Sequence, residues 1–231
     1  MDIIESINTR KSVRAFKSDP VPKAALTEIM ELALRAPSWG NTQPWDFILA
    51  AGKKLDEIKQ GFTDRAGQES LPDIARPQEF PEPYASRRRP ANRPPGAPVA
   101  GVPTPGTQAP GGNPPPRIPN TRFYNAPCMI YICTGRSYYF QPKGVNSWAI
   151  FDCGLIAETI MLLAPNYGLG TVALAQAVTY PEVLRKVLDI PDSMLAVLGI
   201  AIGYPDNADP MNQRRSSREP LNKVSKWLGF D

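Results

Sequence analysis

Residues 9–14, TRKSVR, are the first stretch of the sequence whose side chains could bind a ligand. Arg10, Ser12 and Arg14 stand at alternate positions, and alternate side chains of an extended chain lie on one face. Two guanidinium groups and a hydroxyl on one face can together donate hydrogen bonds to a single anion. A solvated basic turn would explain the same residues without a ligand, so this stretch alone leaves both interpretations open.

A second polar stretch, RAPSWGNTQPWDF, begins at Arg35 and joins an expected helix to an expected strand. It carries hydroxyl and amide groups, at Ser38, Asn41 and Gln43. Amides can pair with alternating donors and acceptors because each amide contains both. Of the two tryptophans, Trp45 is expected to pack at the junction with the strand, whereas Trp39 could equally pack or contact a ligand.

The sequence contains no histidine. This excludes Ser-His and Cys-His nucleophiles, and it removes the ligand on which most transition-metal sites depend. The three cysteines, Cys128, Cys133 and Cys153, include no C-x-x-C pair and match no zinc spacing, so reduced, packed thiols and no metal site are expected. Redox or transfer chemistry must therefore depend on a cofactor, a carboxylate or a lysine.

Length and composition indicate a single globular domain over residues 1–231. The chain is 42% hydrophobic, which is enough for a substantial core. The N-terminal sequence lacks the basic, apolar and small-residue pattern of a secretory leader, so a cytoplasmic location is expected.

A proline-rich segment at about residues 72–119 interrupts this domain and holds 15 of the 27 prolines. Proline removes amide donors and fixes φ, so no packed helix or central strand is expected, and most of the segment should be extended and mobile. The alternatives are a flexible lid or partner-binding loop, a polyproline II ligand of an SH3-type domain, and an altered insert such as the product of a shifted reading frame. Its arginines form a charge run rather than a basic face, so nucleic-acid binding is not expected.

The remaining chain reads as alternating helices and strands. Apolar spacing predicts helices over residues 2–8, 22–36, 54–66, from Asn146 or Ser147 to 164, and over 180–188. Apolar runs rich in β-branched residues predict strands over residues 45–51, 126–135, 170–175 and 194–203. Because β-α-β units do not repeat regularly, this order favours an α+β sandwich.

The expected helix ending near residue 164 is apolar on nearly all sides apart from Asp152 and Glu158. A membrane span needs ~20 apolar residues. This helix is therefore expected to lie in the core or at a subunit interface, and no membrane partner is expected.

Residues 168–173 match the dinucleotide-binding pattern G-x-G-x-x-A. The match follows an expected helix and precedes an expected strand. That order is the reverse of the one that directs a helix N-terminus at pyrophosphate, so the match is expected to be accidental.

Four motifs occur together in an order seen in one family: an N-terminal R-x-S-x-R, APSWGNTQPWDF, GLGT, and IGYP followed by a tail with REPL. In this combination the chain resembles the nitroreductase family of FMN enzymes, over most of residues 1–71 and 121–231. The resemblance implies a nitroreductase-like α/β/α sandwich of the α+β class. It also implies an intertwined homodimer with two FMN sites at the subunit interface.

The resemblance further implies roles for individual residues in FMN binding. Arg10 and Ser12 would hold the phosphate with Arg218 of the C-terminal tail, and Arg14 would approach the N1/C2=O edge of the flavin. The ring and ribityl chain would lie against the connection, at Pro37, Ser38, Asn41 and Gln43. The backbone around two residues would face flavin N5, at Ala175 and Gln176. Two further cofactor contacts are expected, at Lys11 and Ser216.

The implied activity is NAD(P)H-dependent reduction of a small-molecule electron acceptor by a ping-pong mechanism. Arg14 would stabilise the negative charge that reduced FMN carries near N1, and NAD(P)H and acceptor would occupy the same place in turn. The stretches GVNSWAIFDCG and NQRRSSREPL look most like the nitrobenzoate-reductase side of the family, so nitrobenzoate-like nitroaromatics or quinones are the expected acceptors. The alternatives are an FMN-binding protein with little turnover, and another family activity such as reductive dehalogenation or dehydrogenation. The sequence does not choose between NADH and NADPH.

Overall fold

The computed structural model describes residues 1–87, 120–213 and 215–230. The chain divides into two compact units, of which the first comprises Met1–Ala75 with Ile118–Gln213 and the second comprises Arg76–Arg117 with Arg214–Asp231. The expected extended and mobile part of the proline-rich segment falls largely on residues outside this description.

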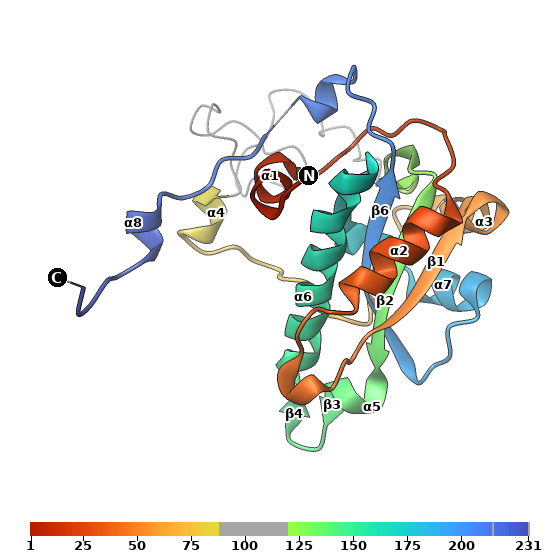
Figure 1. Ribbon diagram of the computed structural model, residues 1–231. Helices are drawn as coiled ribbons and strands as arrows, with labels where there is room; N and C mark the ends of the chain where they lie inside the picture. Colours follow the sequence, from red (N-terminus) through yellow and green to blue (C-terminus); the bar gives the residue numbers. More distant parts are fainter. Residues whose placement is uncertain (88–119, 214, 231) are drawn as a thin grey trace, which may run out of the picture. The chain divides into compact units, whose positions relative to one another are not determined.

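A four-stranded antiparallel sheet forms the centre of the first unit (Figure 1). Its strands, in spatial order, are β1 (Asp46–Ala51), β2 (Cys128–Gly135), β6 (Met194–Gly203) and β5 (Gly170–Leu174). β2 and β6 are the inner strands, which explains why both read as nearly continuous apolar runs: layers cover both of their faces. The predicted strand over residues 194–203 is confirmed at both ends.

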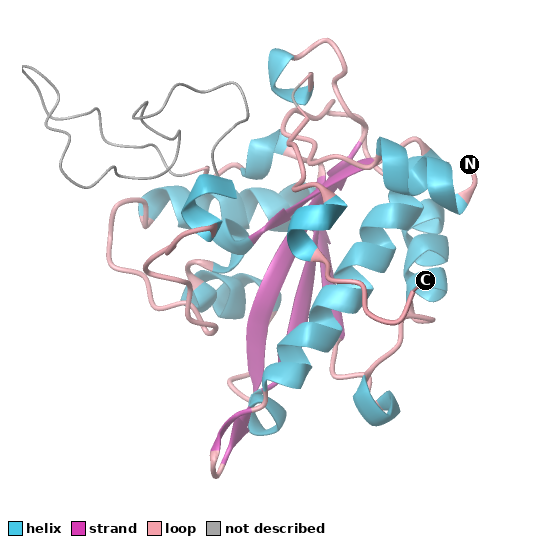
Figure 2. Ribbon diagram, turned by 90° about the vertical axis from the view of Figure 1, so that its left-hand side faces the viewer, coloured by secondary structure: helices cyan, strands magenta, loops and turns pink. Residues whose placement is uncertain are grey.

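Helices cover both faces of this sheet, as Figure 2 shows for the long helix that runs along it. On one face, α2 (Lys23–Ala33) and α6 (Ser147–Leu163) pack against β2 side chains such as Ile130 and Ile132. The other face carries α3 (Gly52–Asp64) and α7 (Pro181–Leu188). The unit is therefore an α/β/α sandwich, and the expected fold class is confirmed.

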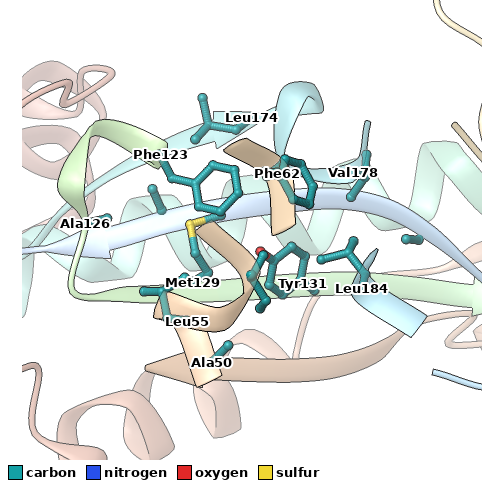
Figure 3. Packing of buried hydrophobic residues seen from close by; sticks show 14 of the residues in the cluster. Ala50, Leu55, Phe62, Phe123, Ala126, Met129, Tyr131, Leu174, Val178 and Leu184 are labelled. Carbon is teal, nitrogen blue, oxygen red and sulfur yellow. The ribbon is translucent and has the colours of Figure 1, made fainter. Parts of the chain in front are cut away.

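Aromatic and aliphatic side chains together fill the layer between the sheet and α3 (Figure 3). Phe62 of α3 meets Phe123 and Tyr180 edge to face, with ring centroids 5.1 and 5.2 Å apart. Phe123 begins the short 3-10 helix η2 (Phe123–Asn125) that leads into β2. This geometry is favourable for aromatic pairs and fixes α3 over the centre of the sheet.

Helix α6 has the local signals that its sequence predicts. The Asn146 side chain accepts a hydrogen bond from Trp148 N–H at its start. At its end, Pro165 lies in the 3-10 helix η3 (Ala164–Tyr167), and Gly168 follows with a left-handed φ of 69°. By length and composition Ser147–Tyr167 could cross a membrane. Its packing against the sheet and α2 accounts for the same composition within a protein core.

The three thiols lie in the core and form no disulfide. Burial raises the pKa of Cys128 to about 11 and the pKa of Cys133 and Cys153 to about 12. Because the thiolate is the reactive form, these cysteines are poor nucleophiles. The expectation of reduced, packed thiols is confirmed.

The sequence-based prediction of helices and strands misses several short elements. It misses α5 (Arg136–Tyr139) and the small hairpin of β3 (Phe140–Gln141) and β4 (Gly144–Val145). These elements have too few residues to establish an apolar period. The helix predicted over residues 22–36 ends earlier, at Ala33, and residues 34–36 form a turn.

The second unit contains two single-turn helices, α4 (Tyr84–Arg87) and α8 (Leu221–Val224). The proline-rich segment was expected to hold no packed helix, and α4, a single turn with no buried residue, is consistent with this; its Glu82 carboxylate accepts from the Ser86 N–H. An ion pair of 3.9 Å joins Arg87 to Glu219 within this unit. Its C-terminal part exposes large apolar side chains, at Leu221, Val224, Trp227, Leu228 and Phe230.

Candidate active site

The N-terminal polar stretch follows α1 (Ile3–Thr9) and lies against the edge strand β5. Ser12 forms a parallel bridge with Thr171, and Val13 N–H donates to Thr171 C=O at 3.0 Å. Val13 points into the protein, whereas its neighbours Ser12 and Arg14 remain partly exposed. The extended, alternating conformation expected for R-x-S-x-R is therefore present.

Gly170 is the residue that lets this stretch approach β5. A Cβ atom at this position would lie 2.5 Å from Val13 Cγ2 and 2.8 Å from Pro205 Cγ, which is too close for any side chain. The GLGT motif thus combines a left-handed helix end at Gly168 with a close contact at Gly170. It follows a helix and begins a strand, as expected for an accidental match to the dinucleotide pattern.

The cations of the N-terminal stretch have different partners. Arg10 Nε lies 3.5 Å from Glu158 Oε1 on α6. Arg14 Nη1 donates to Ser12 C=O at 3.4 Å. The Lys11 ammonium donates to the main-chain carbonyl of Asn212. Arg10 and Lys11 therefore have long-range partners, whereas the side-chain contact of Arg14 is local.

Asn212 is a site residue that sequence reasoning missed. It ends the 3-10 helix η5 (Pro210–Asn212), and its side chain is completely buried, with 0% exposed. Its Oδ1 accepts from Arg14 N–H at 2.7 Å, and its Nδ2 donates to Ala15 C=O at 2.7 Å and to Asp206 C=O at 2.8 Å. Nothing local marks it, because an asparagine in a polar stretch usually faces water.

The connection between α2 and β1 forms a compact turn. Ser38 Oγ accepts from Gln43 N–H at 2.9 Å across the 3-10 helix η1 (Trp39–Asn41). Gly40, Asn41 and Gln43 have left-handed φ values of 58°, 56° and 46°. Such values are ordinary for glycine, tolerated by asparagine and costly for glutamine. Pro37, Asn41 and Gln43 are exposed, and Ser38 is half-buried.

A carboxylate from α6 holds this turn in place. Asp152 has 1% of its surface exposed, and its Oδ2 accepts from Trp39 N–H at 3.1 Å. The Trp39 ring is 60% exposed and stacks on Trp148 of α6 at 6.4 Å. Trp45 is 7% exposed and belongs to the core, so its expected packing role is confirmed.

The third group of expected site residues lies directly after β5. Ala175 and Gln176 are the exposed first residues of the 3-10 helix η4 (Ala175–Val178). Ser12 pairs with Thr171 near the other end of this strand, four residues before Ala175. At ~3.3 Å per residue, the two positions are separated by roughly 13 Å along one sheet edge.

Both polar stretches contact helix α6, but at different positions along its length (Figure 1). The connection contacts its N-terminal part, at Trp148 and Asp152. Arg10 contacts it later, at Glu158, and Asn166 Nδ2 in η3 donates to Ser6 Oγ of α1 at 3.3 Å. The structure brings the Arg10–Arg14 stretch to β5 and to the later half of α6, and it brings the connection to the first half of α6.

The last two expected site residues belong to the second unit. There Arg218 Nη1 donates to Ser216 Oγ at 3.0 Å and to the Ser217 carbonyl at 3.0 Å. The structure thus brings Ser216 and Arg218 together within that unit.

The donor set of the first unit suits a phosphorylated, planar heterocycle. Partly exposed guanidinium and hydroxyl groups stand on the stretch that pairs with the edge of β5, where an anion would be held by charge-assisted hydrogen bonds. The connection adds amide groups with both donors and acceptors. Across residues 1–87, 120–213 and 215–230, no group of three or more His, Cys, Asp or Glu side chains could hold a metal ion.

A sequence model described as the nitroreductase family matches residues 7–204. The chain belongs to the nitroreductase family. The match includes the N-terminal stretch, the connection and the Ala175–Gln176 pair, and it ends before Asn212, Ser216 and Arg218.

Relatives within the nitroreductase family match nearly the whole chain. The chain is 27% identical to the 4-nitrobenzoate reductase of Nocardioides sp. (strain LMS-CY), with 97% of this chain and 89% of the relative covered. It is 29% identical to the nitrobenzene nitroreductase of Ectopseudomonas oleovorans, with 98% and 96% covered. Among solved structures, the FMN and NADPH-dependent nitroreductase NfnB from Sphigopyxis sp. strain HMH matches with a TM-score of 0.78, 26% identity and 100% of both chains covered.

Proposed function

We propose that this chain is an NAD(P)H-dependent FMN nitroreductase that reduces nitroaromatic, nitrobenzoate-like or quinone acceptors by a ping-pong mechanism. The observation that carries the proposal is the alignment of Arg10, Ser12 and Arg14 on the edge of β5, with the Ala175–Gln176 backbone beyond its far end. Membership of the nitroreductase family and the named activities of the relatives support it.

In this proposal the phosphate is bound by Arg10 and Ser12, joined by Arg218 of the C-terminal tail. Hydrogen bonds between ionised partners are stronger than neutral ones, so two guanidinium groups would favour a phosphate at the end of the cofactor. This favours FMN over FAD, because FAD has no terminal phosphate.

The flavin ring is oriented by two other groups of residues. Ser38, Asn41 and Gln43 offer a hydroxyl and two amides to the ring and ribityl chain, and Ala175 and Gln176 offer main chain to the ring centre. Bound FMN supplies the hydride chemistry between NAD(P)H and the acceptor. The Arg14 guanidinium stabilises the negative charge that develops at the ring edge, which requires no histidine.

We further propose that the enzyme is a homodimer, because the two polar stretches contact different halves of α6, at Asp152 and at Glu158. Two copies related by a two-fold axis, with their α6 helices antiparallel, would bring the Arg10–Arg14 stretch of each copy toward the connection of the other. The outward side of α6 exposes Trp148 and Phe151, and α1 exposes Ile3, Ile4 and Ile7. A second copy would bury these apolar side chains.

The proposed intertwining would use a groove beside β1, which among the described residues pairs only with β2. This cavity of about 570 Å³ is lined mainly by apolar side chains, which include Val21, Leu26, Met30, Leu34, Phe47 and Leu49. An unpaired strand edge beside an apolar groove can accept an extended segment. The exposed apolar residues of the C-terminal tail make the tail of the second copy the proposed occupant.

Removal of residues 221–231 tests this arrangement. The truncated protein should sediment as a monomer and lose bound FMN, because both sites would be incomplete. A control with Lys223 and Lys226 changed to alanine keeps the apolar tail and should remain a dimer. A stable, FMN-loaded monomer of the full chain at micromolar concentration would contradict the dimer proposal.

Spectroscopy tests the activity. The purified protein should be yellow, anaerobic NAD(P)H should bleach it, and nitrobenzoate or a quinone should restore the colour, with parallel double-reciprocal plots. Arg14→Ala should slow reduction more than it weakens FMN binding, because its contact strengthens as charge develops. If dithionite bleaches the flavin and NAD(P)H does not, the protein holds FMN without being a reductase.

The role of Arg218 has a separate test. Arg218→Ala should raise the FMN dissociation constant at least tenfold, since loss of a charge-assisted contact costs ~1.5–3 kcal/mol. The matched control is Arg122→Ala, since Arg122 donates to Asn125 elsewhere in the chain. Equal FMN affinity in the two variants would remove Arg218 from the site.

A further inference from the structure

The buried amide of Asn212 joins two segments that are almost 200 residues apart in the sequence. Its Oδ1 accepts from Arg14 N–H, and its Nδ2 donates to the carbonyls of Ala15 and Asp206. Its own main-chain carbonyl accepts from the Lys11 ammonium. Through this single residue, the C-terminal part of the first unit contacts the N-terminal stretch on both sides of Arg14, at Lys11 and at Ala15.

The hydrogen-bonding capacity of an amide fits these three main-chain partners closely. One oxygen accepts and one NH₂ group donates twice, so both donors of the buried side chain are used. Aspartate has the same shape, but as a carboxylate it can only accept, and it would face two carbonyl oxygens. Alanine would leave three partly buried main-chain groups without this partner, of which the Ala15 carbonyl keeps a second donor, the Asp206 N–H, and the Asp206 carbonyl keeps the Asp209 N–H.

The side-chain contacts of Asn212 bear on the backbone on either side of the Arg14 side chain. Arg14 is held through its own N–H and through the carbonyl of the next residue. The preceding residue, Val13, is bonded to Thr171 of β5. Backbone geometry limits the allowed side-chain rotamers, so a backbone fixed on both sides also restricts where the Arg14 guanidinium can stand.

We propose that Asn212 is a positioning residue for Arg14: it sets the backbone that directs the guanidinium to the edge of the flavin. This assignment rests on the proposed function. Asn212 itself touches no cofactor or substrate in this proposal. Its substitution therefore changes the electrostatics of the flavin through Arg14.

The experiment compares Asn212→Ala, Asn212→Asp and Arg14→Ala in the full-length protein. All three variants should lower the midpoint potential of bound FMN, and the two Asn212 variants should weaken FMN binding about tenfold. Once Arg14 is alanine, adding Asn212→Ala should change the potential no further. Hydrogen exchange of the peptide spanning residues 10–17 should speed up in both Asn212 variants of the cofactor-free protein.

Asp73→Asn is the matched control for a purely structural effect. Asp73 is a nearly buried side chain of the same unit that accepts from Ala196 N–H at 2.9 Å and from Arg185, remote from Arg14 in the hydrogen-bond network. This variant should lower the melting temperature while the flavin potential stays at the wild-type value.

The aspartate variant also gives a pH readout. A protonated carboxyl can donate one hydrogen bond, so FMN affinity of Asn212→Asp should recover, relative to wild type, as the pH falls from about 8 to about 5. Asn212→Ala should show no such recovery. This comparison remains informative if the alanine variant does not fold.

Three outcomes would overturn the assignment. The first is wild-type potential and FMN affinity in a folded Asn212 variant, even if it melts earlier. The second is additive shifts of the potential in the Arg14/Asn212 double variant. The third is absence of FMN binding by the wild-type protein. This outcome would overturn the proposed function as well, and measuring the wild-type protein distinguishes it from a failure of the Asn212 assignment alone.

Discussion

The two halves of the candidate site are built in different ways. The stretch from Arg10 to Lys17 is held by residues distant in sequence: Thr171, Tyr204, Pro205 and Asn212. The connection from Pro37 to Gln43 is held largely by its own atoms, through the Ser38–Gln43 hydrogen bond and the left-handed residues between them. Its long-range polar anchors are Asp152, which accepts from Trp39 N–H, and Tyr138, whose hydroxyl donates to Thr42 Oγ1 at 3.1 Å.

The conformation of the connection is therefore specified by local residue preferences, whereas the conformation of the N-terminal stretch depends on tertiary contacts. A self-closed turn is specified by residue types such as Ser, Gly and Asn, whose local preferences favour it. A stretch held by long-range bonds has its conformation only after the sheet has assembled. We therefore expect changes in the core to disturb the N-terminal half first and the connection less.

The largest expected effect comes from Gly170→Ala. The added Cβ would lie 2.5 Å from Val13 Cγ2 and 2.8 Å from Pro205 Cγ, so the N-terminal stretch must move away from β5. Overpacking of this kind costs about 1–3 kcal/mol. We expect a lower melting temperature and an FMN dissociation constant raised at least tenfold, measured by calorimetry and fluorescence titration.

Gly135→Ala is the control for this substitution, because a Cβ there would meet only Tyr138 Cβ at an ordinary 3.8 Å. It should leave FMN affinity unchanged. If both alanine variants bind FMN equally well, close contact with β5 is not what forms the N-terminal half.

A smaller effect is expected from the anchor of the connection. Asp152→Ala removes the acceptor of the partly buried Trp39 N–H, and a lost hydrogen bond of this kind costs about 1 kcal/mol. We expect FMN affinity to fall about fivefold, since the turn itself keeps its Ser38–Gln43 bond. Asp152→Asn retains a carbonyl acceptor and should lose less.

Hydrogen exchange can separate the two halves in these variants. Asp152→Ala should speed exchange at residues 37–43 and leave residues 10–17 protected. Faster exchange in both stretches would mean that a change in the connection is transmitted through α6 to the N-terminal stretch. That result would contradict the proposal that the two halves are held independently.

The ion pair between Arg10 and Glu158 should contribute less again. Glu158 is half-exposed, and exposed pairs are worth about 0–1 kcal/mol. Glu158→Gln removes a negative charge close to the proposed phosphate site, so FMN should bind about two- to threefold tighter at low salt. Glu182→Gln, which breaks the pair with Arg65, is the matched control and should leave FMN affinity unchanged. Weaker binding in Glu158→Gln would indicate that this carboxylate orients Arg10.

The smallest effect on stability should come from Trp39→Leu. The ring is mostly exposed and stacks on Trp148 outside the core. Surface substitutions usually change stability by within about 0.5 kcal/mol. Thermal unfolding should therefore be nearly unchanged, with the lost ring pair visible in the near-ultraviolet circular dichroism. A large drop in melting temperature would show that the turn depends on this stacking.

Much of the fold could be predicted because its signals are local. The buried strand at residues 194–203 and the helix capped by Asn146 stand where apolar runs and a capping side chain indicate. The short elements at residues 136–145 could not be predicted, since a four-residue helix and a two-residue strand have no period to detect. The α4 turn was missed because proline content outweighed the Glu82–Ser86 capping signal.

The sequence by itself determined the composition of the candidate site: alternate Arg10, Ser12 and Arg14, and the Ser38, Asn41 and Gln43 of a turn that closes on itself. These properties follow from residue type and spacing, which act over a few residues. Only the tertiary structure decided that Asn212 holds Arg14, that Asp152 holds Trp39, and that the two stretches contact different halves of α6. Those contacts join residues more than a hundred positions apart, and their geometry exists only once the sheet and helices have packed.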